Sequence, residues 1–418
     1  MITIEPIARA LVPVDSAAAD ALGAPNYDEF QSDVEIWRLL QAKPDCLLAV
    51  TMAHCDAPAP ERIGEPDSEA SLERAAANMA RLVADARTRE CGDILWICEI
   101  TSPQRPAIRQ IGLGGLARTD EIRTPANPAG SIIRNEGVRE AKARGRARLV
   151  ERIDAFVDCV NNAVDDADGA LRAALEAYAD QRPPAFVTTD EAGNLHRVWL
   201  VAESASLEAF RRLLAREPHA YVADGNHRSA AAALLGRAHF PAVFFPAATL
   251  HIAPYNRLVA AAGGAPAPEL GLERAFDVHR WPGAGAFQPA VTHEIGLYDG
   301  DAWWRLRPRS DAFDGADAAQ DIDADIVQRR LFGEALGIAD ARDPRLTFVG
   351  ANRDAAWLQA RVVEGAFRYA VTLPAVTMAQ FVRVCMQGAL MPPKSTWFEP
   401  KIRSGLVMAL FGQGGAGR

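Results

Sequence analysis

Five consecutive residues, Asp224-Gly225-Asn226-His227-Arg228, carry groups that proteins use to hold phosphate. Glycine lets an anion approach the backbone, histidine can donate a hydrogen bond, and the planar guanidinium of arginine can bind two phosphate oxygens. The alanine-rich stretch that follows predicts a helix over residues 229–235, ended by Gly236, while Tyr221 and Val222 are typical of a strand end. The segment is therefore predicted to lie at a strand-to-helix turn, where the helix N-terminus attracts anions.

A purely structural role for this segment stays open on the residues alone. Asp224 would then cap the helix, and Arg228 would pair with an acidic residue at the surface. A second glycine-rich stretch, residues 110–117 (QIGLGGLA), lacks both the GxGxxG spacing and the GK[ST] ending of phosphate loops. Its composition favours a strand with close backbone packing.

Length and charge limit the class of protein. A chain of 418 residues corresponds to two or three lobes, at about 150 residues per domain. The net charge of -9 is spread along the chain and argues against nucleic acid as a partner, because duplex binding needs clustered Lys and Arg. No apolar run is long enough to span a membrane and the start does not resemble a signal peptide, so we expect a cytoplasmic protein.

The cysteines and histidines give no metal-binding pattern. Cys91 and Cys98 form the closest pair, and their spacing matches neither redox nor zinc motifs, so all the cysteines are expected to be free buried thiols. The eight histidines are dispersed, and no dedicated metal site is predicted. Magnesium carried by a nucleotide would leave no such pattern. The six cysteines are Cys46, Cys55, Cys91, Cys98, Cys159 and Cys385.

Apolar periodicity predicts the elements that would position the turn. Strands are expected over residues 47–52 (LLAVTM) and 94–100, with a helix over residues 68–88 between them. A long amphipathic helix is expected over residues 146–164, because the apolar residues from Leu149 to Val160 fall on one stripe.

Turn formers and prolines place the later elements. Strands over residues 185–189 and 197–202 are expected to pair around the turn DEAGN, since Gly193 and Asn194 are turn formers. The other predicted elements are a helix over 207–214, strands over 242–245, 294–297 and 303–306, and a helix over 325–336. Residues 261–268 (AAGGAPAP) are the predicted linker, and residues 412–418 are expected to be frayed.

Several stretches together resemble the DUF1015 family. The turn sequence ADGNHRSAAA is similar to the family signature ADGHHRxxAA, and Asn135-Glu136 stands where the family carries His-Glu. The further matching stretches are residues 196–200 (HRVWL), 254–257 (PYNR), 391–401 (MPPKSTWFEPK) and 404–406 (SGL). The turn and the upstream pair also resemble those of free serine kinases, which share a fold with ParB-type partition proteins and sulfiredoxins.

The resemblance implies roles for particular residues. By analogy with the serine kinases, Glu136 would be the general base, with Asp224 and His227 as further catalytic residues. The nucleotide phosphates would be held by Gly225, Asn226, His227, Arg228 and Ser229. Polar residues near the end of the chain, together with Arg257, are candidates for binding the substrate or closing over the nucleotide, although a solvated loop would explain them equally well. These residues are Lys394, Ser395, Thr396 and Lys401. A sulfiredoxin activity is excluded, because Asn226 stands where those enzymes need cysteine.

The resemblance also implies an architecture and a reaction. The fold would be α+β (mixed α/β), with an N-terminal α/β lobe over residues 1–120, a ParB/sulfiredoxin-like nucleotide-binding core over 121–260, and a C-terminal α/β lobe over 261–418 that returns to the core. The function would be transfer of phosphate from ATP or ADP, with Mg²⁺, to a small hydroxyl compound such as serine. The alternatives are a ParB-type nucleotide-binding switch and a non-catalytic small-molecule sensor. We also consider a homodimer.

Overall fold

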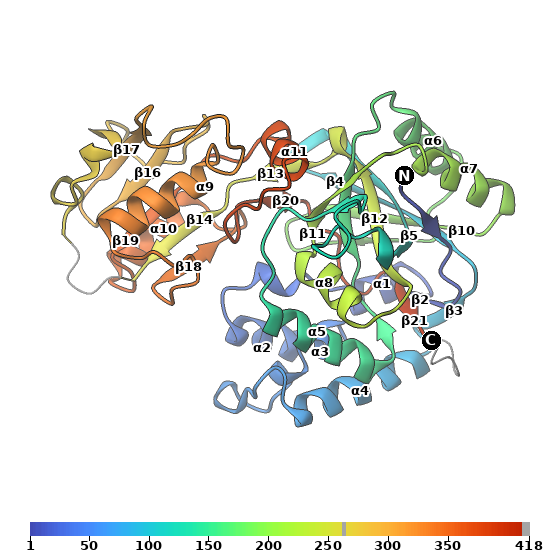
Figure 1. The fold of residues 1–418 in the computed structure, drawn as a ribbon. Helices are drawn as coiled ribbons and strands as arrows, with labels where there is room; N and C mark the ends of the chain where they lie inside the picture. The colour runs from blue at the N-terminus through green and yellow to red at the C-terminus, as the bar shows by residue number, and fades with distance from the viewer. Residues whose placement is uncertain (261–264, 412–418) are drawn as a thin grey trace. The chain divides into compact units, whose positions relative to one another are not determined.

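The computed structural model describes residues 1–260 and 265–411, which form two compact units of mixed α/β structure. The first unit contains Met1–Arg134, Val138–Leu250 and the segment from Pro400 onward. The second contains Asn135–Gly137 and His251–Glu399. The prediction of a mixed α/β fold is confirmed, and Figure 1 shows the helices and strands of each unit.

A nine-stranded sheet forms the centre of the first unit. Its strand order is β6-β11-β8-β12-β5-β4-β10-β9, and β1 pairs with β5 outside this path. The strands are β1 (Ile4–Glu5), β4 (Leu95–Ser102), β5 (Arg105–Arg118), β6 (Ile132–Ile133), β8 (Val160–Val164), β9 (Phe186–Thr189), β10 (Leu195–Val201), β11 (Ala220–Asp224) and β12 (His239–Pro246). Most pairs are antiparallel, but β6 runs parallel to β11 and β8 runs parallel to β12.

Helices and a small second sheet complete the first unit. The helices are α1 (Ser16–Leu22), α2 (Asp33–Ala42), α3 (Leu48–Thr51), α4 (Glu69–Ala84), α5 (Glu140–Ile153), α6 (Ala170–Asp180), α7 (Ser204–Leu214) and α8 (Asn226–Leu234). The small sheet has the order β3-β2-β21-β7, with β2 (Ala10–Pro13), β3 (Thr88–Cys91), β7 (Ala155–Phe156) and β21 (Met408–Leu410). Helix α5 lies between α4 and α8 and contacts both (Figure 1), which places it beside the predicted turn.

The second unit is built on a six-stranded sheet in the order β15-β17-β16-β19-β14-β18 and a two-stranded sheet of β13 and β20. The strands are β13 (His251–Ala253), β14 (Asn256–Val259), β15 (Phe276–Arg280), β16 (Ile295–Tyr298), β17 (Trp303–Pro308), β18 (Leu346–Val349), β19 (Tyr369–Thr372) and β20 (Trp397–Glu399). The helices are α9 (Asp323–Ile326), its π-helical continuation η8 (Val327–Ala335), α10 (Ala355–Val363) and α11 (Met378–Met386).

Several predicted elements are confirmed. The helix over 68–88 is α4, the strand over 94–100 is β4, and the strands on either side of the DEAGN turn are the antiparallel pair β9 and β10. The glycine-rich stretch 110–117 lies in β5, where a side chain at Gly114 would collide with the indole ring of Trp96. Close packing against the strand therefore explains these glycines without a phosphate.

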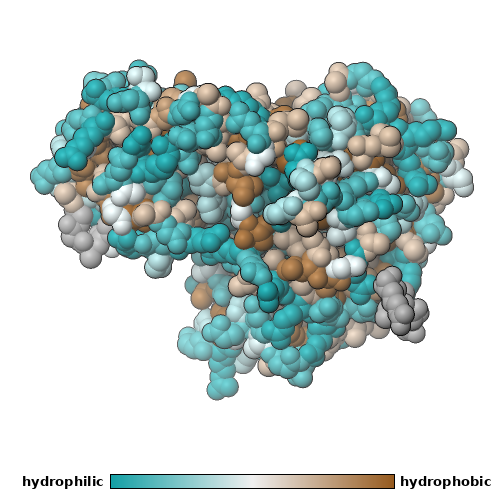
Figure 2. Space-filling view, in the orientation of Figure 1, coloured by the Kyte–Doolittle hydropathy of each residue, from teal (hydrophilic) through white to brown (hydrophobic). Residues whose placement is uncertain are grey.

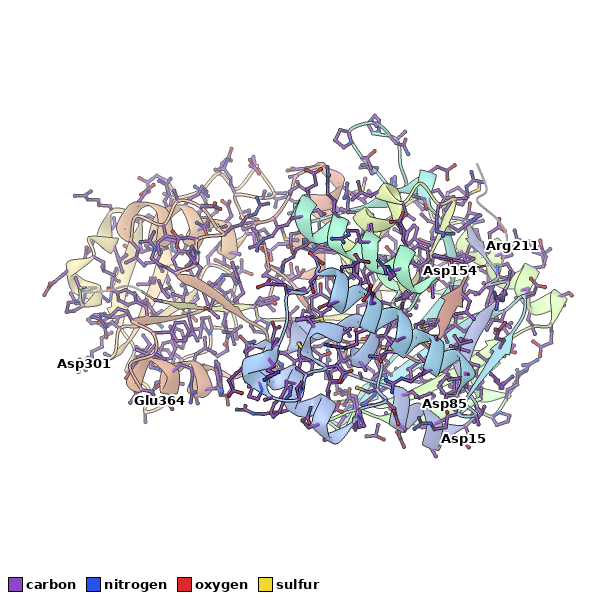
Figure 3. All side chains as sticks on the ribbon, turned by 90° about the horizontal axis from the view of Figure 1, so that it is seen from below. Asp15, Asp85, Asp154, Arg211, Asp301 and Glu364 are labelled. Atoms are coloured by element: carbon purple, nitrogen blue, oxygen red, sulfur yellow. The ribbon has the colours of Figure 1, made fainter. Side chains whose placement is uncertain are left out.

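Two predicted elements are wrong. Residues 48–51 form the short helix α3 and not a strand, because a brief apolar run fits a buried helical turn equally well. The helix predicted over 146–164 ends at Ile153, and the chain then continues into β7 and β8. Asp154, labelled in Figure 3, adopts the left-handed conformation (φ 52°) that ends α5, and Phe156 and Val160 are buried in strands.

The units divide the chain differently from the predicted lobes. Strands on either side of residue 120 belong to the same sheet, since β5 pairs with β12. The main segment of the second unit begins at His251, ten residues before the predicted linker. Residues 261–264 of that linker and residues 412–418 lie outside the described residues. The relation of the first unit to a ParB/sulfiredoxin-like core stays a prediction.

The visible surface in Figure 2 is largely hydrophilic, with apolar side chains scattered over it. Among the described residues, no helix combines the length and the apolar character that crossing a membrane requires. All six cysteines are free thiols, as predicted, but Cys91 and Cys159 are half-buried and not buried.

Candidate functional site

The predicted turn joins β11 to α8. Asp224 is the last residue of β11, and Gly225, at φ 102°, is the N-cap residue of α8. This φ value favours glycine, and an added side chain would also press on Arg228 and Val160. Helix α8 begins at Asn226, three residues earlier than predicted, so Asn226, His227 and Arg228 lie in the first helical turn of α8. The first N–H groups of such a helix lack intrahelical partners and attract anions.

The Asp224 carboxylate lies between two cations. Its Oδ1 is 3.3 Å from Arg228 Nη2 and its Oδ2 is 3.0 Å from Lys401 Nζ, which in turn is 3.4 Å from Asp28 Oδ2. Arg228 also donates to the Cys159 carbonyl at 2.5 Å. Only 8% of the Lys401 side chain is exposed, so these charges pair with one another at low solvent exposure. Arg228 thus holds the backbone and the Asp224 carboxylate in place.

Burial and neighbouring charges shift the pKa values of Arg228 and Glu29 in and beside this cluster. Burial lowers the pKa of Arg228, but the carboxylates of Asp224 and Asp158 outweigh it and raise the pKa above the usual range. Burial raises the pKa of Glu29, next to Asp28, to about 7, against the opposing attraction of Lys401. The folded protein therefore holds a carboxyl group that titrates near neutral pH.

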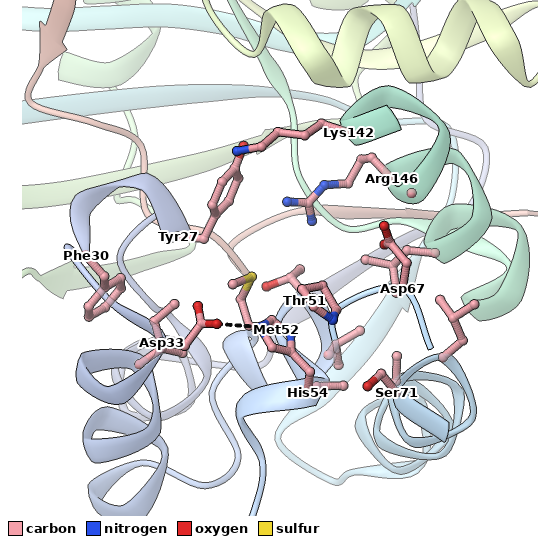
Figure 4. Close-up of a pocket in the computed structure, with 18 of the residues that line it drawn as sticks. Tyr27, Phe30, Asp33, Thr51, Met52, His54, Asp67, Ser71, Lys142 and Arg146 are labelled. Atoms are coloured by element: carbon pink, nitrogen blue, oxygen red, sulfur yellow. Dashed lines mark ion pairs between the residues drawn. The ribbon is translucent and has the colours of Figure 1, made fainter. Parts of the chain in front are cut away.

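A cavity of about 420 Å³ opens beside the turn (Figure 4). His227 lines it from the first turn of α8, and Lys142 and Arg146 reach over it from α5. The Arg146 guanidinium lies 4.7 Å from the centre of the Tyr27 ring. Other lining residues are Phe30, Gln31, Ser32, Asp33, Ile36, Thr51, Met52, His54, Asp67, Ser71 and Leu72. The wall formed by α5 and α8 therefore carries the basic groups of the cavity.

His227 is fixed by a backbone contact, because its Nε2 accepts a hydrogen bond from the Arg139 N–H at 3.2 Å. An accepting Nε2 assigns the proton of the neutral ring to Nδ1. The imidazole thus links the start of α5 to the start of α8.

The wall opposite α5 contains Asp33 and His54. Asp33 Oδ2 lies 3.4 Å from His54 Nε2, and this ion-pair contact is drawn in Figure 4. Burial lowers the pKa of His54, although Asp33 opposes the shift. Burial also raises the pKa of the neighbouring Cys55 thiol to about 12. On the α5 side of the cavity, Asp67 packs so closely on the helix that a side chain at Gly145 would meet its carboxylate.

The remaining predicted residues lie in the second unit, where Glu136 contacts the MPPKST segment. Its Oε2 accepts a hydrogen bond from the Lys394 N–H at 3.2 Å, and the Asn135 carbonyl accepts one from Met391 N–H at 2.9 Å. Lys394 Nζ lies 5.5 Å from the centre of the Tyr255 ring. The structure thus brings together Glu136 and Lys394, which are 258 residues apart in sequence.

Arg257 is buried in the same unit, with 2% exposed. It donates to the Tyr255 carbonyl and lies 4.9 Å from the centre of the Phe348 ring. Burial lowers the pKa of Arg257 to about 10, against attraction from Tyr255 and Glu136. A guanidinium this deeply desolvated favours an anionic partner.

The predicted polar cluster at the end of the chain is divided. Ser395 is buried and donates to the Pro392 carbonyl at 2.7 Å, and Thr396 is half-buried beside it. Lys401 belongs to the first unit with Asp224, whereas Lys394, Ser395 and Thr396 belong to the second.

Three basic residues of the first unit are not apparent from the sequence pattern. Lys142 and Arg146 are four residues apart, a spacing that places two side chains on the same face of a helix. The helix was predicted to start at residue 146 but starts at Glu140, so this shared face was not predicted. Strand β6 is parallel to β11, so Arg134, which follows β6, lies toward the same end of the sheet as the turn that follows β11. Burial lowers the pKa of Arg134. Short strands such as β6 give too little periodicity to reveal this placement.

Residues 4–331 match the family model described as protein of unknown function (DUF1015), and the chain belongs to this family. No curated protein matches the chain.

Solved structures with limited similarity include a free serine kinase in complex with AMP, at 13% identity and a TM-score of 0.38 over 70% of this chain and 92% of that chain. A conserved hypothetical protein from Pyrococcus furiosus has 13% identity and a TM-score of 0.36 over 70% and 95% of the two chains. SbnI with a C-terminal truncation, from Staphylococcus aureus, has 12% identity and a TM-score of 0.37 over 70% and 85%.

Proposed function

We propose that this chain is a nucleotide-dependent phosphotransferase that acts on a small hydroxyl compound, with a free hydroxy amino acid such as serine as the first candidate. The observation that carries the proposal is the shared position of His227, which belongs both to the α8 N-terminus and to a cavity lined by Lys142 and Arg146. Two cations and a helix start on one wall favour a phosphorylated ligand.

The size and lining of the cavity suit a nucleotide. Its volume of about 420 Å³ falls in the range of roughly 300–1,000 Å³ of small-ligand sites. Tyr27 and Phe30 offer aromatic faces for the base, and such stacking contributes about 1–3 kcal/mol per base. The phosphates would lie toward Lys142, Arg146 and the start of α8, with ATP or ADP as the donor.

Asp67 fits a magnesium ion that accompanies the nucleotide. Mg²⁺ takes oxygen ligands and is commonly held by one or two carboxylates together with substrate phosphates. The Asp67 carboxylate lines the cavity beside α5, on the side of Arg146. The bound ion would neutralise phosphate charge.

The acceptor chemistry is assigned to Glu136, Arg257 and the MPPKST segment. Glu136 would take the proton of the acceptor hydroxyl as the oxygen–phosphorus bond forms and the bond to the leaving phosphate breaks. Arg257 and the MPPKST segment, with Lys394, would bind the acceptor carboxylate, since both side chains are cationic and burial desolvates the Arg257 guanidinium. In the first unit, Arg228 and Lys401 would fix Asp224 near the phosphates.

The test is a screen of the purified chain with several nucleotides and hydroxy amino acids, with mass spectrometry to detect a gain of phosphate. We expect a phosphorylated product, and Glu136→Gln should lower turnover by about 10²- to 10⁴-fold while nucleotide affinity is kept. The matched control is Glu140→Gln, a surface carboxylate on α5 that pairs with Arg144. Nucleotide binding without product from any acceptor would contradict the kinase proposal and favour the binding switch.

A further inference from the structure

We propose that Asp33, His54 and Cys55 form a zinc site in the wall of the cavity, with one coordination position open to the cavity. This site is independent of the proposed kinase activity. The three residues come from two elements, since Asp33 begins α2 and the other two lie in the 3-10 turn η2 (Ala53–Cys55).

The geometry is close to that of a metal site. One ligand atom from each residue lies within 4.8 Å of the other two. Tetrahedral zinc, with bonds of about 2.0–2.3 Å, needs its ligand atoms about 3.3–3.8 Å apart. The Asp33 side chain is 50% exposed, so a change of its rotamer can supply this adjustment while the buried partners stay in place.

The other two groups are held in place by burial. His54 is 3% exposed and Cys55 is fully buried. His54 Nε2 faces Asp33 Oδ2 at 3.4 Å but makes no hydrogen bond there. A buried imidazole nitrogen without a hydrogen bond is costly, and coordination to a cation would remove that cost.

The donor set selects the metal. One nitrogen, one sulfur and one oxygen ligand suit zinc, whereas magnesium and calcium prefer oxygen alone. The zinc–sulfur bond would form as the Cys55 S–H bond breaks, with the proton released to solvent. Three protein ligands leave a fourth position for water or for a ligand in the cavity, because Asp33 and His54 both line it.

The experiment is a Co²⁺ titration of the full chain after treatment with a chelator, followed by displacement with Zn²⁺. We expect one Co²⁺ per chain, with thiolate-to-cobalt absorption and the intense visible bands of tetrahedral cobalt. Cys55→Ser should remove the thiolate band and lower zinc affinity at least about 100-fold, since even loss of an outer-shell partner costs about 10- to 100-fold. Cys46→Ser is the matched control, because Cys46 is equally buried in the same apolar cluster but is not among the three donors.

A second variant guards against misfolding of the cysteine variant. Asp33→Asn changes a half-exposed side chain, so the fold should persist while Co²⁺ affinity falls and the visible bands shift. Absence of a thiolate band in the natural chain, its persistence in Cys55→Ser, or its loss in Cys46→Ser would each overturn the proposal. None of these cobalt and zinc measurements uses a nucleotide. A negative result would therefore overturn the zinc site and not the kinase proposal, and a failure to detect kinase activity would not affect the zinc site.

Discussion

Charged side chains gather at two neighbouring places in the first unit and are arranged in opposite ways. Around Asp224, both cations meet carboxylates at 3.0–3.4 Å and are largely buried. In the cavity, Arg146 meets the Tyr27 ring, and no carboxylate among the described residues pairs with it. The charges of the first cluster pair with one another, whereas Arg146 lines the cavity.

The difference separates a structural cluster from the proposed binding surface. The paired charges fix the backbone at the start of α8, because Arg228 bridges Asp224 and the Cys159 carbonyl. Of the groups that would meet a ligand, His227 lies in the segment 224–228 that the sequence singles out, whereas Lys142 and Arg146 lie on α5, outside it. Residues with the strongest sequence pattern can therefore build a site without supplying its main ligand contacts.

Breaking the cluster around Asp224 should have the largest effect on stability. Lys401→Met leaves Asp28 and Asp224 without a close lysine, and we expect a loss of about 3 kcal/mol in the free energy of unfolding, as for other buried ion pairs that lose one partner. Lys43→Met, which removes an exposed pair with Glu191, should cost less than about 1 kcal/mol. Urea titration followed by fluorescence would compare the two, and equal losses would contradict a structural role for the cluster.

Changing the cavity wall should affect binding and not stability. Arg146→Met removes a charge-assisted contact worth about 1.5–3 kcal/mol, so nucleotide affinity should fall about 10- to 100-fold. Arg144→Met is the control on the same helix, since Arg144 is exposed and pairs with Glu140 outside the cavity. Calorimetric titration with ADP gives both affinities, and the same affinity in both variants would place the phosphates elsewhere.

Glu29 should give the smallest effect, visible as a change in the pH dependence of stability. Its pKa in the folded chain is about 7, above the value of 4.5 expected when unfolded, because burial disfavours the carboxylate. The folded state thus binds the proton more tightly, so the stabilisation is complete below pH 4.5 and is lost as the pH rises toward 7.

The matching variant is Glu29→Gln, in which this part of the pH dependence should disappear. The measurement is the unfolding midpoint in urea at several pH values between 4 and 8. The charges of Lys401, Asp28 and Asp190 also shift the pKa of Glu29, and they are kept in the variant. The dependence of stability on pH would therefore weaken only if Glu29 itself binds the proton. An unchanged slope would assign the titration to another group.

The sequence predicts the local features of the site better than its assembly. Gly225 and the alanines after it contain enough local information to predict a strand-to-helix turn, and the structure confirms it. The pairing of Lys401 with Asp224 joins residues 177 positions apart, which periodicity cannot show. The same limit hid the cluster of Asp33, His54 and Cys55, because two of its three members are adjacent and fit no metal-binding spacing.

We propose above that the cavity beside the start of α8 binds a nucleotide. The most direct test is photo-crosslinking of the purified chain with 8-azido-ADP, followed by mass spectrometry of the labelled peptides. We expect labels on the cavity-lining segments that contain Tyr27 and Phe30, and we expect excess ADP to suppress this labelling and Arg146→Met to weaken it. Labels confined to segments that do not line the cavity, or labelling that excess ADP does not reduce, would contradict it.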